Sequence, residues 1–171
     1  GGHMRLGCLH DTYGDGGLFY LNSVNDNNQY STIGWTGLYN VISYANSVML
    51  DMPEAARLNG VSDDVINKAL GEAYLFRAVA YYFLTEYWHE VPIIDNAEAL
   101  ITSGNVQDIY VPKATQRSLY RFICEDLEKA VELLPETDAE AGRVTKWSAK
   151  GMLAKVYLTR AVYEKNHGGY E

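Results

Sequence analysis

One nearly continuous run of apolar and aromatic residues, from Gly71 to Ile94, limits what this chain can fold into. It reads GEAYLFRAVAYYFLTEYWHEVPII. On a helix of this length the apolar side chains point in nearly every direction, which is typical of a helix packed on several sides. Arg77 lies in the middle of the run, where its charge needs a carboxylate or helix-end carbonyl groups as partners. Pro92 removes a backbone donor and favours an extended Val91, so the helix is predicted to end before it.

Helical periodicity recurs on both sides of this run. We predict helices over residues 32–52, 62–88, 115–134 and 145–163. Pro53 is expected to end the first helix or to begin the next turn. The third helix carries a regular apolar stripe that runs from Leu119 to Leu134.

The fourth helix is predicted to turn one set of apolar residues inward. That set is Trp147, Ala149, Met152, Leu153, Val156, Tyr157 and Ala161. We also expect ion pairing between Asp126 and either Arg143 or Lys146 to connect the third and fourth helices. The sequence therefore predicts an all-α fold of tetratricopeptide-like helix pairs, with long loops and an irregular N-terminal segment.

Composition excludes several classes of protein. The 171 residues contain 14 Lys and Arg against 22 Asp and Glu, a formal net charge of -8, so nucleic acid is not expected as a partner. No window approaches the roughly 20 continuous apolar residues of a membrane span.

Cys124 lies on the inner side of its helix and is interpreted as a buried thiol, although a disulfide with Cys8 stays open.

Nothing in the sequence assembles a catalytic site. There is no nucleophile elbow, P-loop, Gly-rich dinucleotide turn or HExxH motif. His10, Asp11 and Asp15 lack the spacing of zinc or calcium ligands and are interpreted as a polar loop. We therefore predict that the protein is not an enzyme, with no catalytic residue, no metal site and no cofactor.

The irregular segment before the first helix is different, because its rings alternate with amides and carboxylates. Sugar rings have an apolar face and a rim of hydroxyls, and flat aromatic side chains beside Asn and Asp match both parts. The alternative is a loop whose rings pack over the helices. As candidate ligand-binding residues we take Tyr13, Asp15, Phe19, Tyr20, Asn22, Asn25, Asp26, Asn28 and Tyr30.

Four signatures follow one another from residue 35 to residue 158. They read W-x3-Y-x2-I-x3-N from Trp35, EA-x-L-x-RA…Y-x2-L…VP from Glu72, Y-x2-I-x2-DL-x2-A-x3-LP from Tyr120 and GR-x-TK-x2-A-x3-LA-x2-YL from Gly142. In this order and spacing the chain resembles the N-terminal part of the SusD/RagB family of nutrient-binding outer-membrane lipoproteins. One departure is Trp88-His89-Glu90, which stands where the family usually has Phe-Gly before the Val-Pro turn.

The resemblance implies non-catalytic capture of a glycan or oligosaccharide at the surface of the bacterial outer membrane. It implies a SusC-like TonB-dependent transporter as partner, and contact with the membrane only through a lipid anchor that this chain lacks. Residues 1–4 are interpreted as a tag remnant, and residues 5–171 as a partial SusD-like helical domain truncated at its C-terminus. The alternative function is a helical-repeat adaptor that binds a protein and has no sugar ligand.

Overall fold

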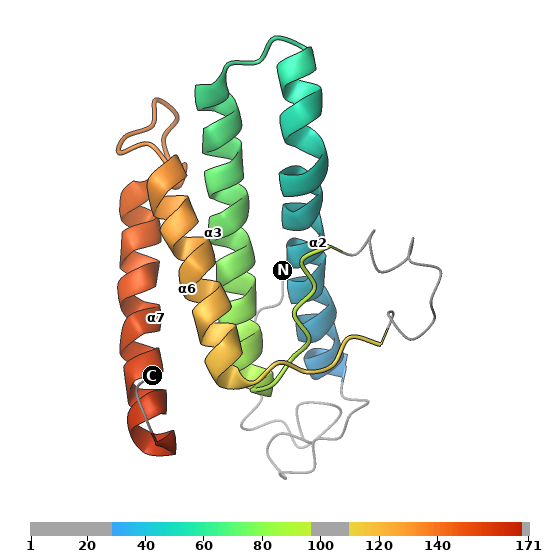
Figure 1. Ribbon diagram of the computed structural model, residues 1–171, viewed down its shortest axis with the longest axis vertical. Coiled ribbons are helices and arrows are strands. Elements are labelled where there is room, and N and C mark those ends of the chain that lie inside the picture. The colour runs from blue at the N-terminus through green and yellow to red at the C-terminus, as the bar shows by residue number, and fades with distance from the viewer. Residues whose placement is uncertain (1–28, 97–109, 169–171) are drawn as a thin grey trace. The chain divides into compact units, whose positions relative to one another are not determined.

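The computed structural model describes residues 29–96 and 110–168, and these residues form four α-helices (Figure 1). The helices are α2 (Gln29–Leu58), α3 (Asp63–Trp88), α6 (Gln116–Leu133) and α7 (Lys146–His167). The described residues contain no strand, only an isolated antiparallel bridge between Pro92 and Lys113. The predicted all-α fold is confirmed. Within the same residues, no helix is long and apolar enough to cross a membrane.

The chain divides into two compact units, residues 1–40 and 41–171, and the boundary falls inside α2. In the described part of the first unit, the rings of Trp35 and Tyr39 contact each other with centroids 4.9 Å apart. The second unit holds the rest of α2 and the other three helices.

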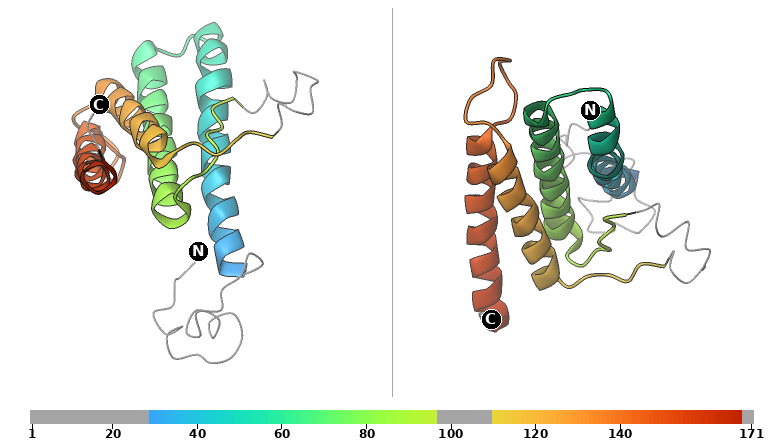
Figure 2. Two further views of the ribbon diagram at one scale, coloured as in Figure 1. Left: turned by 60° about the horizontal axis from the view of Figure 1, so that its bottom comes forward. Right: turned by 45° about the horizontal axis from the view of Figure 1, so that its top comes forward.

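In the second unit, α3, α6 and α7 pack side by side and alternate in direction (Figures 1 and 2). α6 contacts both α3 and α7, so it forms the middle of the packing. Its apolar stripe is buried as predicted, with Leu119, Ile123 and Leu127 fully enclosed. Tyr81 of α3 and Val156 of α7 are also fully buried. Burial of such side chains stabilises the fold by about 1.5–3 kcal/mol each.

Local chemistry sets the ends of these helices. The Thr115 hydroxyl accepts a hydrogen bond from the Ser118 N–H at 3.2 Å, which caps the start of α6. The Thr145 N–H donates to the Ser148 hydroxyl at 3.2 Å at the start of α7. Gly168 ends α7 with φ of 80°, a conformation that favours glycine. Three of the four predicted helices therefore agree closely with the structure.

The first helix was predicted too short. α2 continues through Pro53 to Leu58 instead of ending at the proline. Pro53 loses one hydrogen bond to the preceding turn, but the residues that follow, Glu-Ala-Ala-Arg-Leu, are all strong helix formers. Their propensity carries the helix for more than one further turn.

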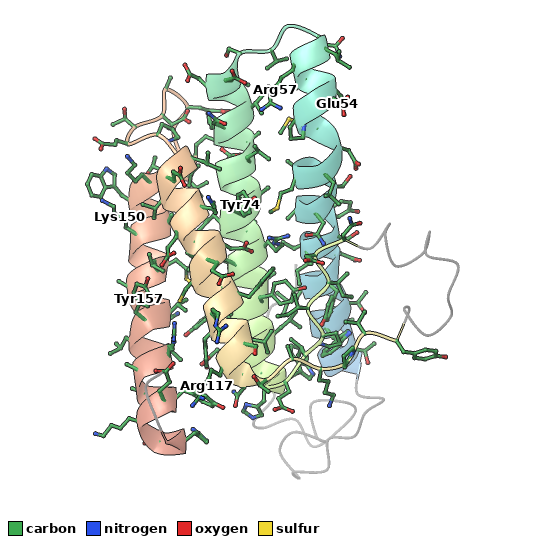
Figure 3. The ribbon with its side chains drawn as sticks, viewed as in Figure 1. Glu54, Arg57, Tyr74, Arg117, Lys150 and Tyr157 are labelled. Atoms are coloured by element: carbon green, nitrogen blue, oxygen red, sulfur yellow. The ribbon has the colours of Figure 1, made fainter. Side chains whose placement is uncertain are left out.

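The predicted inward set of the fourth helix was wrong for two aromatic residues. Ala149 and Val156 are buried, but Trp147 is 57% exposed and Tyr157 is 44% exposed. The Tyr157 hydroxyl, labelled in Figure 3, donates to the Glu128 carboxylate at 2.6 Å across the surface of α6 and α7. α7 contacts α6 along one narrow face, so an apolar residue away from that face stays in contact with solvent.

Candidate ligand-binding site

A buried polar network holds the helices of the second unit in place. The Arg77 guanidinium donates two hydrogen bonds to the Asp126 carboxylate, from Nε at 2.8 Å and from Nη2 at 2.7 Å. Its Nη1 donates to the Asn46 side-chain oxygen at 2.8 Å. The Phe122 ring lies 4.9 Å from the guanidinium carbon, a cation–π distance. One side chain of α3 thereby joins α2 to α6.

The same network fixes the chain that leaves α3. The Asn46 amide donates to the Ile94 carbonyl at 2.8 Å. The Tyr81 hydroxyl accepts from the Ile94 N–H at 2.7 Å and donates to the Ile94 carbonyl at 3.2 Å. Burial raises the pKa of Tyr81 to about 12, although the Ile94 contact and the Arg77 charge oppose this. Both backbone groups of Ile94 are therefore satisfied without regular secondary structure.

Of the two predicted kinds of partner for Arg77, a carboxylate or helix-end carbonyl groups, the structure shows a carboxylate, but the predicted partners of Asp126 were wrong. Arg143 pairs with Glu72 of α3 at 3.3 Å and with Glu140 at 2.7 Å. Lys146 pairs with Glu136 at 3.6 Å. Asp126 faces α3 from the buried side of α6, whereas both basic residues lie beyond the C-terminal end of that helix.

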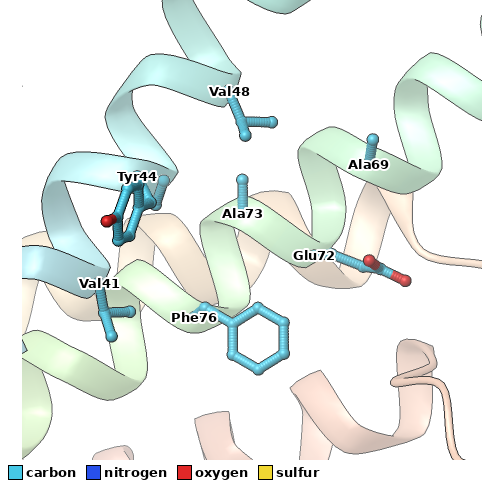
Figure 4. A pocket seen from close by; sticks show the side chains of 8 residues that line it. Val41, Tyr44, Val48, Ala69, Glu72, Ala73 and Phe76 are labelled. Carbon is cyan, nitrogen blue, oxygen red and sulfur yellow. The ribbon is translucent and has the colours of Figure 1, made fainter.

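An open groove lies between α2 and α3 (Figure 4). Its volume is about 410 Å³, within the roughly 300–1,000 Å³ typical of small-molecule sites. The lining residues are Val41, Tyr44, Ala45, Val48, Ala69, Glu72, Ala73 and Phe76. Tyr44 is 74% exposed and Phe76 is 48% exposed, so two rings are available at the mouth of an otherwise aliphatic groove.

Glu72 is the one charged residue of this lining. Its Oε2 accepts the Arg143 hydrogen bond, while its Oε1 is buried and has no hydrogen-bond partner among the described residues. A buried acceptor without a partner costs about 1–3 kcal/mol. The groove can therefore offer apolar contact and two rings to a ligand, while one Glu72 oxygen is bonded to Arg143 and the other is buried.

The groove gives no test of the ligand-binding site that was predicted from the sequence. Tyr13, Asp15, Phe19, Tyr20, Asn22, Asn25, Asp26 and Asn28 lie outside the described residues, as does the side chain of Tyr30. The backbone of Tyr30 belongs to the first turn of α2. Cys124, by contrast, is described, and it is buried as a free thiol whose pKa burial raises.

Sequence reasoning missed Phe76 because it expected the apolar run of α3 to pack on several sides, and it singled out nothing at Tyr44 of α2. In the structure Tyr81 and Tyr82 are buried, but Phe76, Phe83 and Tyr87 are exposed. The signal that was available is the breadth of the apolar pattern. Helix α3 carries apolar residues on more faces than are buried in the described part of the chain.

The end of α3 carries a strained residue at the place where the sequence departs from the family pattern. His89 has φ of 63° and ψ of -87°, and it is the only non-glycine residue with positive φ among those described. Its Nδ1 lies 3.2 Å from the Gln116 side-chain nitrogen. Glycine adopts positive φ readily, whereas other residues pay about 1–3 kcal/mol. α3 therefore runs to Trp88 and ends in a turn where His89 has a backbone conformation that favours glycine.

This arrangement defines a class, an α-helical protein of tetratricopeptide-like helix pairs with an apolar groove. Among the residues described, no group of three or more His, Cys, Asp or Glu side chains could hold a metal ion. A family model described as "Starch-binding associating with outer membrane" matches residues 15–158. The chain belongs to this family, the SusD-like proteins.

Individual relatives agree with this assignment. A SusD-like protein of Bacteroides ovatus is 38% identical over 135 residues, which cover 79% of this chain and 23% of the relative. A protein whose crystal structure was solved with a xylogluco-oligosaccharide is 32% identical, with a TM-score of 0.66 over 82% of this chain and 26% of that one. A laminarin-binding SusD-like protein is 27% identical, with a TM-score of 0.62 over 74% of this chain and 26% of that one. This chain therefore spans about a quarter of the length of these relatives.

Proposed function

We propose that this chain is part of a cell-surface protein that binds an oligosaccharide without chemically changing it. The protein delivers the oligosaccharide to a SusC-like TonB-dependent transporter, and a lipid anchor holds it on the bacterial outer membrane. The observation that carries this proposal is membership of a family described by starch binding and outer-membrane association. Relatives named for a xylogluco-oligosaccharide and for laminarin support a carbohydrate as the ligand class.

The proposed contact residues are the rings and amides between Tyr13 and Tyr30. Tyr13, Phe19, Tyr20 and Tyr30 supply flat apolar surfaces for sugar rings. The Asp and Asn side chains between them supply acceptors and donors for the hydroxyl rim. The groove between α2 and α3 offers a single carboxylate beside its aliphatic walls, so it has far fewer groups for hydroxyls.

The test is glycan binding by the full-length protein, measured by calorimetry with xyloglucan and laminarin oligosaccharides. Tyr20→Ala is expected to weaken binding about tenfold, which corresponds to roughly 1.4 kcal/mol of lost stacking. Tyr110→Ala is the matched control, since Tyr110 is 78% exposed and belongs to no proposed site. Equal affinities for the wild type and Tyr20→Ala would contradict the proposed contact residues. No binding to any glycan of a broad array would contradict the function.

The groove favours a second candidate, the helical-repeat adaptor that binds a protein. Its walls are mostly aliphatic. Grooves of this kind bind a partner helix that places apolar side chains into them at helical spacing. A thermal melt separates the two functions. If the N-terminal rings are core, Tyr20→Ala lowers the melting temperature; if they form an exposed platform, the melting temperature is unchanged.

A further inference from the structure

Asn59 and Gly60 form the only Asn-Gly pair in the sequence, and they lie in the turn that ends α2. Both residues are exposed to solvent. The side-chain amide carbon of an asparagine is open to attack by the backbone nitrogen of the next residue, and a glycine there has no Cβ to hinder the attack. Asparagine is also one of the thermolabile residues that proteins of hyperthermophiles use less often. The exposed pair is therefore a candidate site of chemical modification.

Backbone geometry explains why a glycine ends this helix. Gly60 has φ of 76°, and a Cβ at this position would meet nothing within 4 Å, so the backbone conformation is the constraint. The Gly60 N–H donates to the Arg57 carbonyl at 3.0 Å, and the Val61 N–H donates to the Ala56 carbonyl at 3.0 Å. These two hydrogen bonds form a Schellman motif, which commonly ends a helix at a glycine. The residue that ends α2 is thus also the residue that leaves the Asn59 amide open to attack.

The closed turn holds the two reacting groups in other hydrogen bonds. The Asn59 side-chain nitrogen donates to the Ala55 carbonyl at 2.7 Å, so the amide lies back along α2. The Gly60 nitrogen, which must attack, is bonded to the Arg57 carbonyl. Arg57, labelled in Figure 3, also pairs with Asp63 across the turn, with Nε and Oδ1 3.2 Å apart. Attack requires the nitrogen and the amide carbon to come into line, so the turn has to open first.

We propose that Asn59 is a site of spontaneous deamidation whose rate is set by opening of this turn. The Gly60 nitrogen loses its proton to hydroxide and forms a bond to the side-chain carbonyl carbon of Asn59. The bond between that carbon and the amide nitrogen breaks, and the nitrogen takes a proton from water and leaves as ammonia. Water then opens the cyclic succinimide at either carbonyl, which gives aspartate or isoaspartate at this position. The sequence of steps needs no oxidant or reductant.

The product is expected to loosen the end of α2 further. A carboxylate does not donate to the Ala55 carbonyl, so the hydrogen bond of the Asn59 amide is lost. It also places negative charge at the C-terminal end of a helix, where the helix dipole disfavours it. Isoaspartate in addition lengthens the backbone between α2 and α3 by a methylene group. Deamidation is therefore expected to weaken the connection between these two helices as the protein ages.

The experiment incubates the full-length protein in mildly alkaline buffer and measures conversion at each asparagine by peptide mass spectrometry. Asn166 is the matched control, because it is exposed in the last turn of α7 but is followed by His167. Conversion is expected to be faster at Asn59 than at Asn166. Arg57→Ala is expected to raise the rate at Asn59 about two- to fivefold, the change in opening that the loss of an exposed ion pair gives. Lys129→Ala removes an exposed ion pair of α6 and should leave the rate unchanged.

Three results would overturn the proposal. One is conversion at Asn59 that is no faster than at Asn166, because the pair would then not be a modification site. Another is the same rate at Asn59 in the wild type and in Arg57→Ala, because opening of the turn would then not set the rate. The third is a synthetic peptide of residues 55–65 that converts no faster than the folded protein, because the closed turn would then offer no protection.

Discussion

Replacing Arg77 with alanine tests the account of the core most directly. Arg77 makes three hydrogen bonds, two to Asp126 and one to Asn46, and its side chain is 9% exposed beside an Asp126 side chain that is 5% exposed. Removing one partner leaves the other charge buried and unpaired, which typically costs about 3–5 kcal/mol. That is a large share of the roughly 5–15 kcal/mol that stabilises a domain. For a domain of this size, the melting temperature should fall by about 6–20 °C.

The assay is thermal and urea unfolding followed by circular dichroism, with an exposed pair as control. Lys129 and Glu132 are 59% and 68% exposed and lie 3.5 Å apart, so Lys129→Ala should change stability by about 1 kcal/mol or less. Combining Arg77→Met with Asp126→Leu removes both charges and should recover most of the loss. A melting curve for Arg77→Ala that overlays the wild type would refute the reasoning.

Three further substitutions test other parts of the structure. Gly71→Ala should lower the free energy of unfolding, measured by urea titration, by about 1–2 kcal/mol. The reason is that the added methyl overpacks against Leu134, which costs more than the gain in helix propensity. Increased stability would contradict the close contact. His89→Gly should raise stability by about 1 kcal/mol, because glycine relieves the positive φ; a lower urea midpoint would show that the turn is unstrained. The pKa of Tyr81 in the folded chain is about 12, above its usual 10.0. The protonated hydroxyl therefore contributes fully to the free energy of unfolding below pH 10, and this contribution declines as pH rises toward 12. The stability difference between the wild type and Tyr81→Phe should therefore shrink by about 1 kcal/mol between pH 8 and pH 11, and a constant difference would contradict the raised pKa.

Sequence alone determined the local features of this protein. Capping residues such as Thr115 and the regular stripe of α6 act within one or two turns, so periodicity predicted three helices closely. The need of Arg77 for a polar partner also follows from sequence, since a charge in the middle of an apolar helix must be paired. The family signatures are local as well, and the family model that matches residues 15–158 confirmed the family they indicated.

Tertiary structure decided which partner and which face each residue took. Asp126 rather than another carboxylate reaches Arg77, because the crossing of α3 and α6 brings residues 49 positions apart into contact. Trp147 and Phe76 have the same apolar character as core residues, yet they are 57% and 48% exposed in the folded chain. Periodicity shows that a face is apolar, but only the position of a neighbouring helix shows whether that face is covered. The groove between α2 and α3 could therefore be found only in the folded chain.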